Sequence, residues 1–226
     1  MICRTLYLVD DDPSSRRDLI GELSALDLET WPFAAAVQFS AMLGQLQPAP
    51  VLLSMDLAPE GAAFAVLEEM VATGRHWPVV AFGANPDMRT AVEAMKRGAI
   101  DFLTRPVATL DLGDALAGAL ALLDDIRDEE ALRADAQARI ACLTPRESEV
   151  ANSLIGGLGN KSAAHRLGLS VRTVEMHRAR LLRKLGVRSL AEAASLIAHA
   201  RIAAPSAGLR LRRSLAARDT ILPAPR

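Results

Sequence analysis

The chain has 226 residues, half of them hydrophobic, and its net charge of −1 hides an asymmetry: residues 1–120 carry 8 basic and 16 acidic residues, whereas 141–226 carry 15 and 5. This length allows a substantial core and two domains, and the basic C-terminal part is where a polyanionic partner would bind. The chain has two cysteines, Cys3 and Cys142, which lack metal-ligand spacing, and this argues against a disulfide scaffold and a zinc site. It has no long apolar run, which argues against a membrane span. Together these features predict a cytoplasmic protein.

Short apolar runs alternate with helical segments through the first half of the chain. The runs are residues 5–9, 28–33, 51–55, 79–82 and 100–103. Amphipathic segments follow them, to about residue 26, near 35–46, 61–73 and 87–97, and from 109 onward. This alternation predicts an α/β domain with a doubly wound, five-stranded parallel sheet. The near-continuous apolar run Val51–Met55 fits a strand that is buried on both faces.

The acidic cluster Asp10, Asp11 and Asp12 follows the first predicted strand. In parallel sheets the functional crevice lies at the carboxyl ends of the strands. Carboxylates there can hold Mg²⁺, with Asp11 and Asp12 as the candidate ligands. The cluster fits a second interpretation equally well, because acidic residues are also favourable at a helix N-terminus.

From Asp111 the sequence contains no helix breaker until Thr144-Pro145, and it is rich in Ala, Leu, Glu and Arg. This composition favours one long helix or two abutting ones that connect the domains. We predict a first domain over 1–122, a helical linker over 123–140, a second domain over 141–204 and a mobile basic tail over 205–226. The tail either solubilises the protein or adds DNA affinity.

Residues 143–196 contain three sequence patterns that are typical of helix N-termini. Thr144 with Pro145 and Glu147 forms a capping box, Ser170 precedes an apolar-periodic run, and Ser189 with Glu192 forms a second box. Asn160 can cap a short helix that ends at Leu167, and Gly168–Leu169 leave room only for a tight turn. A short helix, a glycine-containing turn and a longer helix predict a helix-turn-helix.

The helix expected over 170–185 has two different faces. At about 100° per residue, Val174, Leu181 and Leu185 lie together on one side and form a packing face. The opposite side carries groups that suit the major groove of DNA. These are Arg172, Met176, Ala179 and Arg183, with Glu175 and Arg180 at its edges.

LTPRE, followed by GLGNKSAAHRLGLSVRTVEMHRARLLRKLGVRS, resembles the four-helix, all-α DNA-binding domain of LuxR/FixJ-type transcription regulators over some 55 residues. The resemblance implies backbone contacts to DNA from Asn160 and Lys161, phosphate contacts from Arg172, Thr173 and Arg180, and base contacts from Glu175, Met176 and Ala179. It also implies that a helix over 189–200 dimerises the protein, and we expect Leu190, Ala194 and Ile197 to make the contact.

LVDDDPSSRR and AVEAMKRGAIDFLTRPV resemble the flavodoxin-like receiver domain of bacterial response regulators across about residues 3–122. The sequence departs from that family's pattern at three functional positions. Counting back from Pro59 places Met55 at the phosphoacceptor position, with Asp56 one residue late. The hydroxyl position that ends the fourth strand is assigned to Phe82, and the lysine position before Pro106 holds Arg105. Phe102 keeps the family's aromatic position.

The slip from Met55 to Asp56 has a geometric consequence. Side chains alternate across a strand, so Asp56 should point away from a crevice that position 55 faces. Only a bulge or a shortened turn before Pro59 would bring Asp56 into the crevice. We expect Arg105 to pair with the cluster Asp10–Asp12 instead.

The sequence therefore predicts a DNA-binding transcription regulator that works without phosphorylation, without a cofactor and without enzymatic activity, because it offers neither a nucleophile–base pair nor a phosphate loop. Its expected partners are double-stranded DNA, a second copy of the chain, and a regulatory protein or ligand at the receiver. One alternative is an ordinary two-component regulator that is phosphorylated on Asp56 with Mg²⁺ at Asp11 and Asp12. The other is a receiver that sequesters a partner protein and binds DNA only secondarily.

Overall fold

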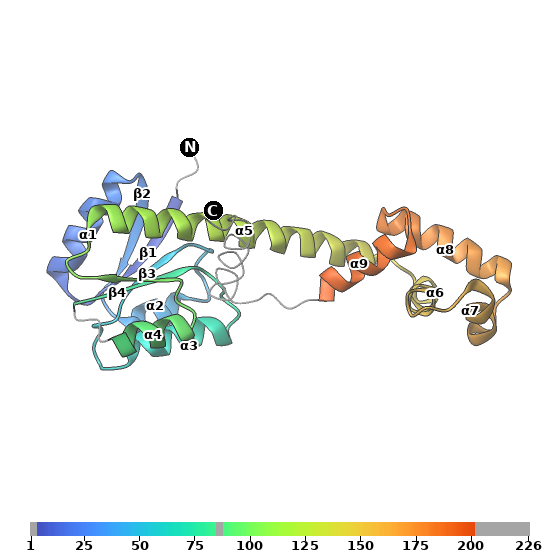
Figure 1. The fold of residues 1–226 in the computed structure, drawn as a ribbon, viewed down its shortest axis with the longest axis horizontal. Helices are drawn as coiled ribbons and strands as arrows, with labels where there is room; N and C mark the ends of the chain where they lie inside the picture. Colours follow the sequence, from blue (N-terminus) through green and yellow to red (C-terminus); the bar gives the residue numbers. More distant parts are fainter. Residues whose placement is uncertain (1–3, 85–87, 202–226) are drawn as a thin grey trace, which may run out of the picture. The chain divides into compact units, whose positions relative to one another are not determined.

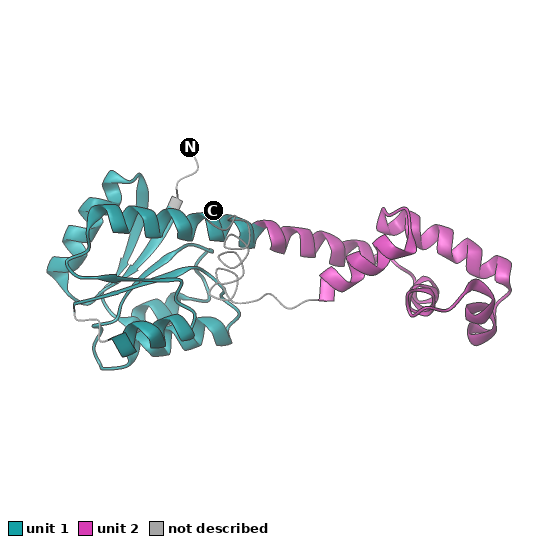
Figure 2. Ribbon diagram, viewed as in Figure 1, with its two compact units in different colours: residues 1–127, 204–226 teal, residues 128–203 magenta. Residues whose placement is uncertain are grey.

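The computed structural model describes residues 4–84 and 88–201, which form two compact units that divide after Arg127 (Figure 2). The predicted tail, residues 205–226, and the end of the predicted second domain lie outside the described residues. The extents of the four predicted segments remain predictions. None of the helices formed by the described residues is both long and apolar enough to cross a membrane.

The first unit is an α/β domain. Its parallel sheet has the order β2-β1-β3-β4-β5. The strands are β1 (Arg4–Val9), β2 (Leu28–Phe33), β3 (Val51–Ser54), β4 (Val79–Gly83) and β5 (Asp101–Thr104). The helices are α1 (Pro13–Ala25), α2 (Ala36–Met42), α3 (Ala62–Ala72), α4 (Met88–Lys96) and the N-terminal part of α5 (Thr109–Ala141). Helices α1 and α5 cover one face and α2, α3 and α4 the other (Figure 1). The predicted doubly wound sheet is confirmed.

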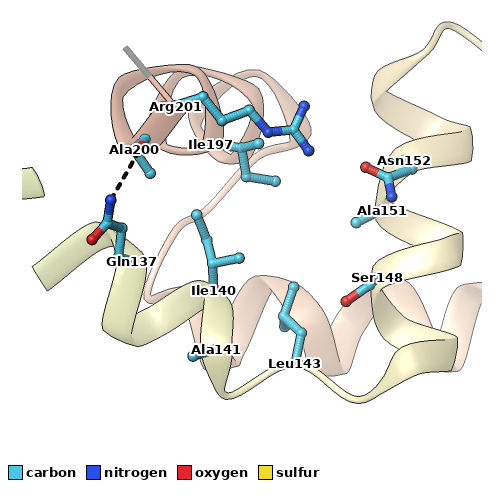
Figure 3. Close-up of a pocket in the computed structure, with 10 residues that line it drawn as sticks. All are labelled: Gln137, Ile140, Ala141, Leu143, Ser148, Ala151, Asn152, Ile197, Ala200 and Arg201. Atoms are coloured by element: carbon cyan, nitrogen blue, oxygen red, sulfur yellow. Dashed lines mark hydrogen bonds between the residues drawn. The ribbon is translucent and has the colours of Figure 1, made fainter. Parts of the chain in front are cut away.

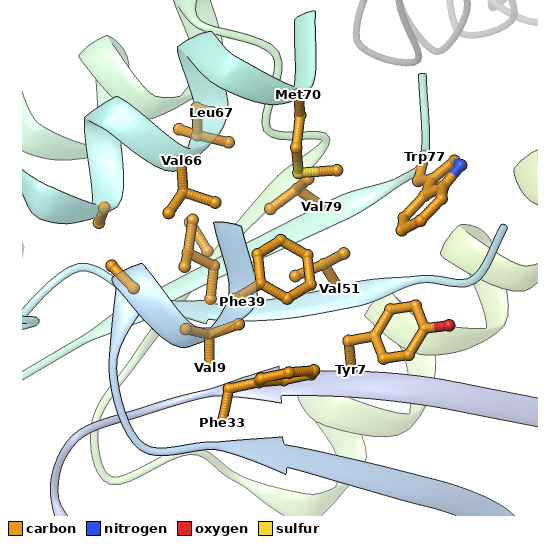
Figure 4. Close-up of a cluster of buried hydrophobic side chains, with 14 of the residues drawn as sticks. Tyr7, Val9, Phe33, Phe39, Val51, Val66, Leu67, Met70, Trp77 and Val79 are labelled. Atoms are coloured by element: carbon orange, nitrogen blue, oxygen red, sulfur yellow. The ribbon is translucent and has the colours of Figure 1, made fainter. Parts of the chain in front are cut away.

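Alternation along the strands builds a separate core on each face. Tyr7 and Val9 of β1 are buried with α2 and α3, around the aromatic cluster in Figure 4. Leu6 and Leu8 are buried with α1 and α5. The ring centroids of Tyr7 and Phe33 are 6.1 Å apart, in an edge-on arrangement that favours aromatic pairs. Burial on both faces explains why β3 is continuously apolar up to Leu53.

Helix α5 is a single helix of 33 residues, one of the two predicted forms. Its first turns bury Leu112 and Leu116 against the sheet. Its last turn packs Ile140 against the core of the second unit. The boundary between the compact units therefore falls inside a continuous helix.

The second unit contains α6 (Pro145–Ile155), α7 (Asn160–Leu167), α8 (Val171–Leu185) and α9 (Leu190–Arg201). The predicted capping box at Thr144 is present, and the side chains of Ser170 and Ser189 accept from the backbone N–H groups three residues later. Asn160 begins α7, and Gly159 takes the cap position instead. Gly168 adopts φ 64° in the turn between α7 and α8, a conformation that glycine reaches without strain. The helix-turn-helix is confirmed.

Candidate functional site

Arg105 occupies the crevice at the carboxyl end of the sheet, as predicted. Its Nη2 atom donates to Asp10 Oδ1 at 2.9 Å and to Ser54 Oγ at 3.2 Å. Asp10 is fully buried, whereas the Arg105 side chain is 18% exposed. Asp12 and Asp56 each have a carboxylate oxygen 3.8 Å from the guanidinium. One guanidinium thus faces three carboxylates, and the buried one receives its direct hydrogen bond.

Asp56 lies in this crevice, which corrects the prediction that it points away. Strand β3 ends at Ser54, and Met55 and Asp56 already belong to a turn, so strand alternation does not extend to them. Asp56 Oδ2 accepts from the backbone N–H of Ala84 at 2.8 Å. The Met55 side chain packs instead against the core that contains α2 and α3. Strand β3 thus ends one residue earlier than predicted, and the turn that follows it brings Asp56 into the crevice.

Gly83, and not Phe82, is the β4 residue that faces Asp56. A Cβ atom at Gly83 would lie 3.4 Å from Asp56 Oδ1, whereas the Phe82 side chain is fully buried in the core beneath α1 and α5. The assignment of Phe82 to the hydroxyl position is therefore wrong by one residue. Phe82 has another role, because its ring lies 4.8 Å from the Arg105 guanidinium carbon in a cation–π contact. The sheet register that pairs Gly83 with Thr104, the residue before Arg105, places Gly83 at the hydroxyl position, and the sequence alone does not reveal that register.

The remaining predicted crevice residues have separate contacts. Asp11 Oδ2 accepts from the backbone N–H of Ala58 at 2.9 Å. Asp12 caps α1 by accepting from the Ser14 N–H at 2.9 Å, so the helix-terminus interpretation of the acidic cluster holds for this residue. Phe102 is partly buried and packs against the core below α4.

These residues do not fit a Mg²⁺ ion. Mg²⁺ requires near-octahedral oxygen ligands, and it would compete with the Arg105 guanidinium for the carboxylate of Asp10. Asp11, Asp12 and Asp56 each already use an oxygen atom on a backbone N–H group. No group of three or more metal-ligating side chains is suitably placed in the part of the chain that the structure describes.

Helix α8 of the second unit exposes the predicted DNA-reading face. Val174, Leu181 and Leu185 are fully buried, as the periodicity predicted. All six predicted groove-facing side chains are exposed, namely Arg172, Glu175, Met176, Ala179, Arg180 and Arg183. On the preceding helix α7, Lys161 is exposed and Asn160 is half-buried. The Thr173 hydroxyl is 2.7 Å from Ser170 Oγ, so it takes part in the cap of α8.

An ion pair that the sequence did not reveal joins α6 to α8, between the buried carboxylate of Glu147 and the partly exposed ammonium of Lys184. Lys184 Nζ donates to Glu147 Oε2 at 2.7 Å and to the Cys142 carbonyl at 3.1 Å. The Lys184 hydrogen bond and the Thr144 backbone N–H together lower the pKa of the buried Glu147 carboxyl from 4.5 to about 2. Lys184 is therefore committed to holding the two helices together, although it lies on the basic helix.

Two of the three residues predicted for dimerisation pack inside their own unit. Ile197 is 8% exposed, and Leu190 packs against the core of α6, α7 and α8. Ala194 is half-buried, and Ala191 and Ala198 are exposed near it on the same helix. Around Ala194 the surface of α9 therefore presents small side chains rather than the predicted leucine and isoleucine.

Comparison with known proteins agrees with both units. Residues 141–197 match the family described as bacterial regulatory proteins, luxR family, and residues 6–117 match the response regulator receiver domain. The transcriptional regulatory protein FixJ of Bradyrhizobium diazoefficiens is 33% identical over 187 residues, 83% of this chain and 91% of that protein. TdiR of Thauera aromatica is 30% identical over 82% of this chain and 81% of that protein. The solved structure of the response regulator StyR superposes with a TM-score of 0.72 at 33% identity, over 86% of this chain and 98% of that one.

The chain is thus a response regulator in which a receiver domain is joined to a luxR-type helix-turn-helix domain. It belongs to the FixJ-type family of DNA-binding transcription regulators. This membership confirms the predicted transcription regulator and its DNA partner, and it agrees with a protein whose output is binding rather than catalysis.

Proposed function

We propose that this regulator controls transcription without phosphorylation of its receiver. The observation that supports the proposal is the ion pair between Arg105 and the fully buried Asp10. Because the Arg105 guanidinium occupies the crevice permanently, it holds the loops around it in one conformation. DNA binding is then controlled by a partner protein, by a ligand or by the abundance of the regulator. Gly83 supports the same conclusion, because it has no hydroxyl to donate to a phosphoryl group on Asp56.

A specific observation favours phosphorylation on Asp56 as the second candidate. Its side chain is 43% exposed, and one carboxylate oxygen already accepts from the Ala84 N–H. A phosphoryl group at this position would lie within reach of Arg105, and a planar guanidinium pairs well with phosphate oxygens. The two candidates therefore differ in whether adding a phosphoryl group changes DNA binding.

We expect Asp56→Asn to bind promoter DNA as tightly as the parent protein, because asparagine keeps the oxygen that accepts from Ala84. Beryllofluoride with Mg²⁺ should change neither the DNA affinity nor the state of association. Fluorescence anisotropy with a labelled promoter fragment measures the affinity. A tenfold gain in affinity on beryllofluoride treatment, about 1.4 kcal/mol, that Asp56→Asn abolishes would establish the phosphorylation switch instead.

We further propose that α8 enters the major groove. Arg172, Arg180 and Arg183 would bind phosphates, and Glu175 and Met176 would contact base edges, since a carboxylate accepts from cytosine and a thioether packs on a thymine methyl. Asn160, Lys161 and Thr173 would add backbone contacts, and Ala179 would allow close approach. This proposal rests on the exposed face described above.

Two substitutions separate phosphate contacts from base reading. Arg180→Ala should weaken binding to all sequences alike and reduce the slope of log affinity against log salt by about one unit. Glu175→Ala should leave that slope unchanged and alter the preference at one base position by about 1–3 kcal/mol. Salt titrations and a set of single-base operator variants measure these effects. Unaltered profiles for both proteins would show that α8 is not the reading helix.

We also propose that the protein dimerises on DNA through α9, because one reading helix covers only a few base pairs. The contact would centre on Ala194 with Ala191 and Ala198, whose small side chains allow two helices to approach closely.

Ala194→Glu should therefore reduce the number of chains on a two-site operator from two to one, because it places a charge in this contact. Sedimentation of the protein–DNA complex measures the stoichiometry. Ala131→Glu, at an exposed position of α5, is the control and should keep two chains. Two chains per operator with Ala194→Glu would exclude α9 as the contact.

A further inference from the structure

A groove of about 340 Å³ opens in the second unit between the end of α5, the start of α6 and the end of α9 (Figure 3). Ile140, Leu143 and Ile197 form its apolar floor. Its volume falls in the range of small-molecule sites, about 300–1,000 Å³. Gln137 Nε2 donates to the Ala200 carbonyl at 3.2 Å and closes one end by joining α5 to α9.

Three polar side chains of the groove lie toward its α6 side, whereas Gln137 lies at the opposite end (Figure 3). The Arg201 side chain extends from α9 toward α6, where Asn152 and Ser148 line the groove (Figure 3). Arg201 is exposed and takes part in no ion pair recorded among the described residues. The described lining includes no acidic side chain. The groove thus combines the positive charge of Arg201 and the hydrogen-bond donors of Asn152 and Ser148 with an apolar floor. This combination is complementary to an anion that carries an apolar chain.

We propose that this groove binds a small organic carboxylate with an apolar chain. The carboxylate pairs with Arg201 and accepts from Asn152 and Ser148, and the chain covers Ile140, Leu143 and Ile197. Such a ligand contacts three helices at once, so it stabilises the second unit. The proposal is independent of phosphorylation and of Asp56, because every residue involved lies in the second unit.

Isothermal titration of the full-length protein with octanoate tests the site, and octylamine is the matched probe of opposite charge. We expect saturable binding of one octanoate per chain, a rise in the melting temperature of the second unit by linkage, and no saturable binding of octylamine. Arg201→Gln should weaken octanoate binding at least tenfold. Arg188→Gln, which removes an exposed arginine outside the groove, should leave it unchanged.

Asn152→Phe provides a second variant that fills the groove from an exposed position and should abolish binding without disturbing the core. Lack of saturable octanoate binding would overturn the proposal, as would equal binding of octylamine or equal binding by Arg201→Gln and the parent. Binding only after residues 210–226 are removed would also overturn it, because the groove would then belong to the chain's own tail.

Discussion

Arg105→Met should destabilise the receiver by about 3–5 kcal/mol, the usual cost of removing one partner from a buried ion pair. Asp10 is fully buried, and its Oδ2 atom has no hydrogen-bond partner among the described residues. Without the guanidinium, a charged carboxylate would stay in the interior close to Asp12 and Asp56. Methionine retains much of the apolar stem of Arg105, so the loss reports on the guanidinium, which includes its cation–π contact with Phe82.

Urea unfolding followed by tryptophan fluorescence isolates this effect, because Trp31 and Trp77 are the two tryptophans of the chain and both lie in the first unit. Asp10→Asn combined with Arg105→Met should recover part of the loss, since the amide carries no charge, and the double-mutant cycle gives the coupling energy. Arg97→Met removes an arginine from exposed ion pairs with Glu93 and Glu68 and should cost much less. Equal losses for Arg105→Met and Arg97→Met would contradict a structural role for the buried pair.

The fold could be predicted because its signals are local and repeated. Alternation of apolar residues with helical segments predicted every strand of the sheet to within two residues, and capping residues such as Thr144 and Ser170 marked where helices begin. The two faces of α8 could be predicted from helical periodicity, because residues such as Val174 and Leu181, seven positions apart, lie on the same side of a helix.

The crevice could be predicted only in part, because it depends on where strands end. Counting from Pro59 and Pro106 identified Met55 and Arg105, but a count cannot show that β3 stops at Ser54 and that the turn carries Asp56 into the crevice. For the same reason the hydroxyl position was assigned to Phe82 instead of Gly83, because β4 is one residue longer than predicted. On α9, the packing of Leu190 and the burial of Ile197 depend on contacts with distant residues that helical periodicity does not specify.

The second unit should lose stability as the pH falls from about 4.5 to about 2, because Glu147 has its pKa lowered from 4.5 to about 2 in the folded protein. The unfolded chain binds a proton through this interval while the native state does not, so stability is present above the ordinary glutamate pKa and declines below it. The shift corresponds to a contribution on the order of 3 kcal/mol at neutral pH. Protonation of Glu147 breaks its ion pair with Lys184 and so removes this contribution.

Glu147→Gln should therefore destabilise the second unit strongly at pH 6 and roughly half as much at pH 3, where the parent has already lost over half of the contribution. Amide hydrogen exchange in α6 and α8 measures the second unit separately, since tryptophan fluorescence reports on the first. Glu149→Gln is the control, because its partner Arg146 is half exposed and the pair contributes little. If Glu147→Gln and the parent differed by the same amount at pH 6 and pH 3, the lowered pKa would not be the source of the stability, and packing of α6 on α8 would account for it instead.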